Sequence, residues 1–100
     1  MNKYAVRLYP RAYRDLDGIY AYIARHLQEP GTALAMAEEL ESAILSLEQL
    51  PHRGAVRRSG VYANGPYRQL FVKNYCIVYR VVEAQQEVRV VTVRYTPSSF

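Results

Sequence analysis

The chain has only one cysteine and no long apolar run, and both features limit the cellular compartment in which the protein can function. Because Cys76 is the only cysteine among 100 residues, no intramolecular disulfide can form and nothing favours an oxidising compartment. The first ten residues contain no continuous apolar segment like that of a secretion signal. No run approaches the roughly 18 apolar residues of a membrane span. We therefore expect a cytoplasmic protein with no membrane partner.

Acidic residues are missing from the middle of the chain. No carboxylate lies between Glu48 and Glu83, whereas that interval holds six cations: Arg53, Arg57, Arg58, Arg68, Lys73 and Arg80. The net charge is +4 and most of the positive charge is arginine, whose planar fork suits phosphate and carboxylate groups. This uneven distribution indicates a polyanion or an acidic protein as the partner.

The sequence also lacks a group of metal ligands. His26 and His52 each stand alone, without a cysteine or carboxylate at the spacing of a metal site. We expect neither a metal nor another cofactor. Cys76 lies between apolar neighbours, so we expect a buried and unreactive thiol.

Length and composition favour one ordinary globular domain over residues 1–100. A chain of this size has room for one core, and half of the residues are apolar while 22% are charged. Alternation over residues 3–9 predicts a strand, and Pro10 is well placed to begin a helix over residues 11–27. After an interruption at Glu29–Thr32, we expect Thr32 to cap a second helix that Pro51 closes.

The second half of the chain predicts strands. Residues 51–66 show no period and are expected to be a loop, which at this length is often functional. Three strand-like runs follow at residues 67–72, 75–82 and 88–95, separated by Lys73-Asn74 and by Glu83–Glu87. The pattern predicts an α+β fold of order βααβββ, in which an N-terminal helical hairpin packs on a small, antiparallel-rich sheet.

The same residues carry a family resemblance that covers nearly the whole chain. The stretch Tyr67–Val81, together with Leu8–Ala12, Ile19–Ile23 and Leu47–Gly54, resembles the RelE/ParE superfamily of toxins from type II toxin–antitoxin systems. The resemblance implies a growth-inhibiting toxin, associated with plasmid stabilisation, that a cognate antitoxin neutralises by wrapping its surface. Operator DNA would be reached only indirectly, through that antitoxin.

Two activities occur in this superfamily, and fold alone does not choose between them. RelE-like members cut mRNA in the ribosomal A site, and ParE-like members poison DNA gyrase. The nucleases commonly have an arginine where this chain has Cys76, and a basic pair after the last strand, where this chain has Thr96–Ser99. These departures favour the ParE-like branch, with gyrase as target and no hydrolysis.

Two alternatives stay open beside the gyrase hypothesis. A ribosome-dependent mRNA endoribonuclease (mRNA interferase) could use a rearranged catalytic site of Arg68, Arg80, Arg94 and Tyr95. A remnant without toxicity could still bind and titrate the antitoxin.

Six cations are candidates for binding the target or the antitoxin. Strand alternation places Arg80 and Arg94 on the outward face of the sheet. They are either solvated or part of a basic binding surface. The same two interpretations apply to the adjacent Arg57 and Arg58 in the loop. The full set is Arg57, Arg58, Arg68, Lys73, Arg80 and Arg94. The ten tyrosines are expected to serve packing more often than base stacking.

Overall fold

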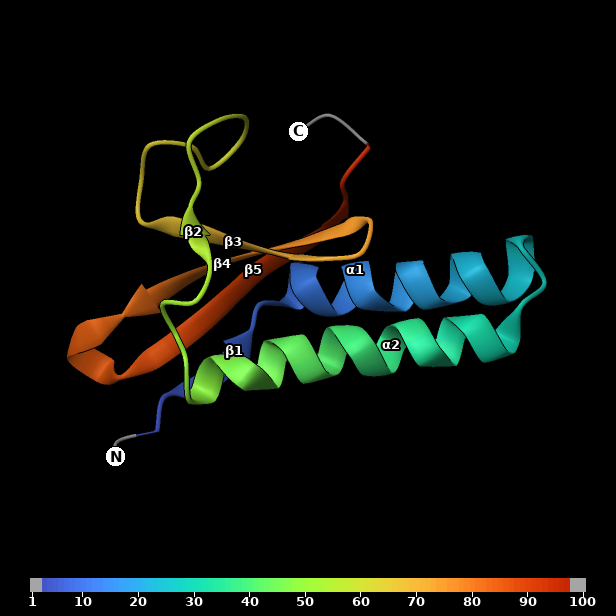
Figure 1. Ribbon diagram of the computed structural model, residues 1–100, viewed down its shortest axis with the longest axis horizontal. Coiled ribbons are helices and arrows are strands. Elements are labelled where there is room, and N and C mark those ends of the chain that lie inside the picture. The colour runs from blue at the N-terminus through green and yellow to red at the C-terminus, as the bar shows by residue number, and fades with distance from the viewer. Residues whose placement is uncertain (1–2, 98–100) are drawn as a thin grey trace.

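The computed structural model describes residues 3–97, in which two helices lie against one face of a five-stranded sheet (Figure 1). The helical hairpin consists of α1 (Pro10–Ala21), a π-helical turn η1 (Tyr22–His26), α2 (Pro30–Leu45) and a 3-10 turn η2 (Ser46–Glu48). The strands are β1 (Ala5–Leu8), β2 (Ala55–Val56), β3 (Tyr67–Val72), β4 (Tyr75–Val82) and β5 (Glu87–Tyr95), and the 3-10 turn η3 (Glu83–Gln85) joins the last two. The predicted α+β architecture is confirmed.

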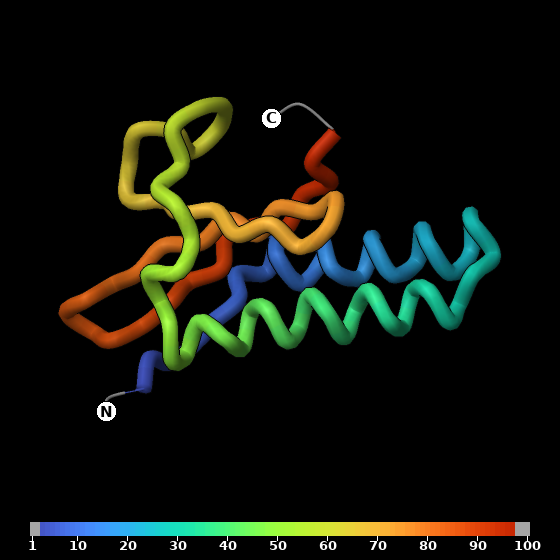
Figure 2. The backbone as a smooth tube through the Cα atoms, viewed as in Figure 1, coloured from blue at the N-terminus to red at the C-terminus, as the bar shows by residue number. Residues whose placement is uncertain are grey.

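The strand order is β1-β5-β4-β3-β2, so the first strand of the chain lies beside the last. β1 runs parallel to β5, and every other pair is antiparallel. The backbone trace shows how the chain leaves β1, forms the two antiparallel helices and returns to the opposite edge of the sheet (Figure 2). This arrangement leaves one face of the sheet free of helices.

Proline sets the start of both helices. Pro10 is the first residue of α1, as predicted, because its fixed φ suits a helix start and its missing N–H is not needed there. The prediction that Thr32 caps the second helix is wrong, because α2 already begins at Pro30 with Glu29 as its N-cap. Thr32 lies in the first turn, where its hydroxyl donates to Glu29 Oε1 at 3.3 Å.

The core lies between the helical hairpin and the facing side of the sheet. Its fully or nearly buried members come from both layers: Ala12, Ile23, Leu40, Ile44, Leu47, Ile77, Tyr79, Val88, Val90 and Val93. Each large apolar side chain buried there stabilises the fold by about 1.5–3 kcal/mol. Because Ile77 and Tyr79 face this core, the alternate residues of β4 point to the helix-free face.

The stretch 51–66 contains a strand that the sequence did not predict. Ala55 and Val56 form β2, which pairs with Gln69 and Arg68 of β3. Before it, the Gly54 N–H donates to the buried Tyr79 hydroxyl at 3.0 Å. Two residues are too few for an alternating pattern to appear, so the four-stranded sheet expected from the sequence becomes five-stranded. Within residues 3–97, no helix combines the length and apolar character needed to cross a bilayer.

Candidate functional site

The helix-free face carries a row of three arginines across three neighbouring strands. Arg7 of β1 is paired with Arg89 of β5, and Arg89 is paired with Arg80 of β4. Residues that are directly paired in a sheet project their side chains from the same face. We call Arg7, Arg89 and Arg80 the arginine row. It ends at Tyr67 of β3, which is the register partner of Arg80.

One carboxylate serves two members of the row. Glu87 is 8% exposed and accepts hydrogen bonds from Arg7 Nε at 2.5 Å and Arg89 Nε at 2.6 Å. Hydrogen bonds from Arg89, and then from Arg7, lower the pKa of the Glu87 carboxyl below its ordinary value. Arg89 also donates to Gln85 Oε1 at 2.9 Å. These contacts fix the orientation of the first two arginines.

Arg80 has different surroundings. Its guanidinium carbon lies 6.0 Å from the centre of the Tyr67 ring. Its Nε is buried and has no hydrogen-bond partner among the groups that the structure describes. Tyr62, from the loop between β2 and β3, packs on Tyr67 with ring centres 4.9 Å apart. Tyr62 has a φ of 71°, an unusual backbone conformation for a bulky residue.

The structure separates the residues of the predicted nuclease site. Arg80 and Arg94 lie on the helix-free face, as predicted, with Arg94 Nε 3.3 Å from the Thr92 hydroxyl. Arg68 lies on the opposite face, because its register partner is the core residue Tyr79. There its Nη1 donates to the Gly54 carbonyl at 2.7 Å. The three arginines therefore do not converge on one point.

The two loop arginines differ in their environment. Arg57 is 7% exposed, and its guanidinium donates to the Val61 carbonyl at 2.5 Å and to Gln69 Oε1 at 3.1 Å. The interpretation of Arg57 as a solvated charge is therefore wrong, because the loop folds back and buries this side chain against the sheet. Arg58 is exposed.

The remaining candidates lie at the end of the sheet near the β3–β4 turn. Lys73 forms an ion pair with Glu39 of α2 at 3.4 Å. The half-exposed Tyr95 ring packs beside Tyr75, with ring centres 5.7 Å apart. These side chains are separated from the arginine row by the paired residues Val78 and Thr92 of β4 and β5.

Cys76 is fully buried, as predicted. Burial raises the pKa of its thiol, and the nearby Arg57 guanidinium offsets only part of that effect. Within residues 3–97, no cluster of three or more histidine, cysteine or acidic side chains is arranged to hold a metal ion. His52 instead contacts Glu83 Oε1 at 2.5 Å, and the Tyr4 hydroxyl donates to the other oxygen of Glu83.

Sequence reasoning missed Arg7 and Arg89. Alternation along each strand can indicate to which face of the sheet an arginine points. However, only the parallel pairing of β1 with β5 brings Arg7 beside Arg89.

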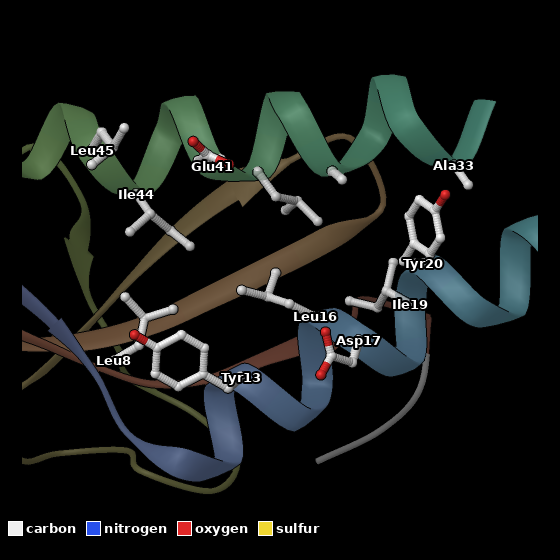
Figure 3. A pocket seen from close by; sticks show the side chains of 12 residues that line it. Leu8, Tyr13, Leu16, Asp17, Ile19, Tyr20, Ala33, Glu41, Ile44 and Leu45 are labelled. Carbon is white, nitrogen blue, oxygen red and sulfur yellow. The ribbon is translucent and has the colours of Figure 1, made fainter. Parts of the chain in front are cut away.

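A second feature is an apolar groove between α1 and α2, beside Leu8 of β1. The groove encloses a cavity of about 450 Å³. Figure 3 shows Tyr13 and Tyr20 of α1 and Leu45 of α2 along its rims, and Leu8, Leu16 and Ile44 further inside. Tyr13 is 58% exposed and Leu45 is 49% exposed. Exposed apolar side chains gathered around a groove are typical of a surface that binds a protein, a membrane or a ligand.

Comparisons with known proteins agree on the fold. Residues 6–97 match the family model described as the ParE toxin of the type II toxin–antitoxin system, parDE. A search among curated proteins found no significant match. Among solved structures, the chain resembles the chromosomal ParDE system of P. aeruginosa with a TM-score of 0.76 and 23% identity, covering 93% of this chain and 96% of that one.

Two further structures are similar. The toxin–antitoxin complex RelBE2 of Mycobacterium tuberculosis matches with a TM-score of 0.65 and 22% identity, over 95% of this chain and 93% of that one. The isolated RelE toxin of E. coli matches with a TM-score of 0.65 and 16% identity, over 96% of this chain and 87% of that one. At these identities the similarity establishes the fold, and function has to be argued from the site.

Proposed function

The chain belongs to the ParE toxins of type II toxin–antitoxin systems, and from that premise we propose that it inhibits growth by binding DNA gyrase rather than by cutting mRNA. The observation that carries this proposal is the separation of Arg68 from Arg80 and Arg94 on opposite faces of the sheet. An RNA-cutting site needs a base, a group that stabilises the phosphorane and an acid within reach of one phosphate. The arginines of the alternative nuclease site do not meet this requirement.

The other groups near the arginine row support the same proposal. Glu87 is held between two arginines, and its pKa is lowered. It therefore stays ionised and is a poor proton donor. Cys76 occupies the position where nuclease relatives commonly have an arginine, and its side chain is fully buried. The face is rich in cations, and the carboxylate between two of them is held in its ionised form, which suits binding better than hydrolysis.

We also propose that a cognate antitoxin covers the groove between α1 and α2. The groove is apolar and is flanked by large side chains that water would otherwise contact. An amphipathic helix that lays its apolar face into such a groove is a common mode of peptide recognition. The similarity to the solved RelBE2 toxin–antitoxin complex is consistent with a partner of this kind.

A supercoiling assay with purified gyrase tests the proposed target. The toxin is added in increasing amounts to gyrase and relaxed plasmid, and we expect supercoiling to fall as toxin concentration rises. Addition of the antitoxin should restore supercoiling, which excludes a contaminant as the inhibitor. Unchanged supercoiling at every toxin concentration, with a correctly folded toxin, contradicts the proposal.

A further inference from the structure

We infer that the antitoxin segment in the groove between α1 and α2 is a helix whose apolar stripe is flanked by basic residues on both sides. One flank would meet Asp17 of α1 and the other would meet Glu41 of α2, which line the groove together with its apolar residues. We rest this inference on the proposed binding of the antitoxin in the groove. The two carboxylates add the charge that selects the fitting antitoxin.

Each rim of the groove carries one carboxylate. On α1, Asp17 follows Tyr13 by four residues and precedes Tyr20 by three, so the three side chains share one face of the helix. On α2, Glu41 precedes Leu45 by four residues and shares its face in the same way. Figure 3 shows one carboxylate on each helix, beside these large side chains. A helix laid along the groove would therefore have one carboxylate on either side.

The groove is long enough for a helix of about three turns. Its α2 wall extends from Ala33 to Leu45, which corresponds to a rise of about 18 Å. Asp17 and Glu41 both lie away from the ends of the groove. Both carboxylates would therefore face the middle of the partner helix, where its ends cannot substitute for side chains as partners.

Neither carboxylate has a partner of its own. Among residues 3–97, no ion pair or hydrogen bond involves the carboxylate of Asp17 or Glu41, and both residues are exposed. No arginine or lysine of the described chain lines the groove, although the net charge is +4. The groove is therefore a negative region on a basic protein. Such a region repels an anionic membrane or a nucleic acid and attracts a cationic segment.

Covering the groove would remove water from both carboxylates. An ionised carboxylate that loses its water without gaining a partner costs free energy. A wholly apolar or neutral helix would leave that cost in place, and acidic flanks would add repulsion between like charges. Arginine or lysine on the flanks would replace the lost water with ion pairs, and in paired helices such flanking charges set which partner binds.

Calorimetric titration of purified toxin with the antitoxin encoded beside its gene measures the contribution of each carboxylate. We expect Asp17→Asn and Glu41→Gln each to weaken binding about three- to fivefold at low salt, because each removes one ion pair at the rim. The loss should shrink at high salt, which screens exposed charges. The matched control is Glu38→Gln, which removes the same charge from an exposed position of α2 outside the groove lining and should change affinity little.

The direction of the change distinguishes basic flanks from the alternatives. If Asp17 and Glu41 were covered by apolar or neutral groups, the same two substitutions would strengthen binding, because they would remove the cost of dehydrating an unpaired charge. Tighter binding of these two variants would therefore overturn the inference. A loss of affinity equal to that of Glu38→Gln would overturn it as well.

Charge exchange identifies the antitoxin residue that meets Glu41. Glu41→Lys should weaken binding at least about tenfold, because a cation would then face a cation. Each arginine and lysine of the antitoxin is replaced by glutamate in turn, and one replacement should restore binding to Glu41→Lys while weakening binding to the wild-type toxin. Thermal unfolding of every variant separates a loss of binding from a loss of folding. The absence of any restoring replacement would contradict the proposed flanks.

The binding of the antitoxin in the groove is tested separately by Leu45→Arg. If Leu45→Arg weakens binding whereas Asp17→Asn and Glu41→Gln do not, the antitoxin occupies the groove without basic flanks, and only the charge assignment fails. If Leu45→Arg has no effect either, the antitoxin binds elsewhere and the proposed use of the groove fails too. Neither result decides whether gyrase is inhibited, which the supercoiling assay measures.

Discussion

Replacing Gly54 with alanine tests how the segment after the helical hairpin is held on the sheet. A Cβ at this position would lie 2.6 Å from the main-chain oxygen of Gln69 and 2.7 Å from the Tyr79 hydroxyl. Both contacts are shorter than van der Waals packing permits. The Gln69 oxygen belongs to β3, so it cannot move away without disturbing the pairing of β2 with β3.

The expected cost follows from two terms. Overpacking of a tightly packed site costs about 1–3 kcal/mol. Displacing the main chain also breaks the hydrogen bond from Gly54 N–H to the buried Tyr79 hydroxyl, which costs about 1–3 kcal/mol when a buried partner is left unsatisfied. The two terms are not fully additive, because one shift of the main chain would both relieve the overlap and break the hydrogen bond. We therefore expect Gly54→Ala to lower the free energy of unfolding by about 2–4 kcal/mol. For a domain of this size, Tm should fall by roughly 8–32 °C.

Circular dichroism during heating and in urea measures this change. Gly65→Ala is the matched control, because the nearest atom to its added Cβ is Tyr67 Cδ2 at 3.8 Å, an ordinary contact. That variant should stay within about 0.5 kcal/mol of the wild type. If Gly54→Ala were as stable as the Gly65 control, the packing described for this segment would be refuted.

Three further predictions follow from other contacts. Asp15→Asn should lower the free energy of unfolding by about 1–2 kcal/mol in urea titrations, because the Asp15 carboxylate accepts both the Thr92 hydroxyl and the Val93 N–H. Leu45→Arg should weaken antitoxin binding at least about tenfold in calorimetry, since it places a charge in the apolar groove, whereas Leu34→Arg, outside the groove lining, should not. The pKa of Glu83 is lowered by hydrogen bonds from Tyr4 and His52, so this carboxylate stabilises the fold above its ordinary pKa of 4.5 and loses that effect as pH falls through its lowered value. The stability difference between wild type and Glu83→Gln should therefore shrink on acidification in pH-dependent melts, and a difference that stayed constant would contradict this role.

Much of the fold could be predicted because its elements are long and periodic. The two helices and the strands β3, β4 and β5 have apolar patterns that depend on local sequence alone. β2 could not be found, because two residues such as Ala55 and Val56 carry no period. The position of β1 beside β5 depends on a parallel pairing between the two ends of the chain, for which the sequence offers no local signal.

The candidate site was predicted less completely for the same physical reason. Alternation along β4 correctly placed Arg80 on the helix-free face. Arg68 was grouped with it, although the register of β3 with β4 turns Arg68 to the helix side. The burial of Arg57 depends on a loop that folds back on the sheet. Sequence positions reveal which residues share a strand face, but tertiary pairing decides which faces meet.

We propose that this toxin acts on gyrase and does not cut mRNA. Induction of the toxin in growing cells, without its antitoxin, tests the claim when plasmid supercoiling and mRNA 5′ ends are measured in the same culture. We expect growth arrest with a loss of negative supercoiling and no new codon-linked mRNA ends. Codon-linked mRNA cuts with unchanged plasmid supercoiling would contradict it.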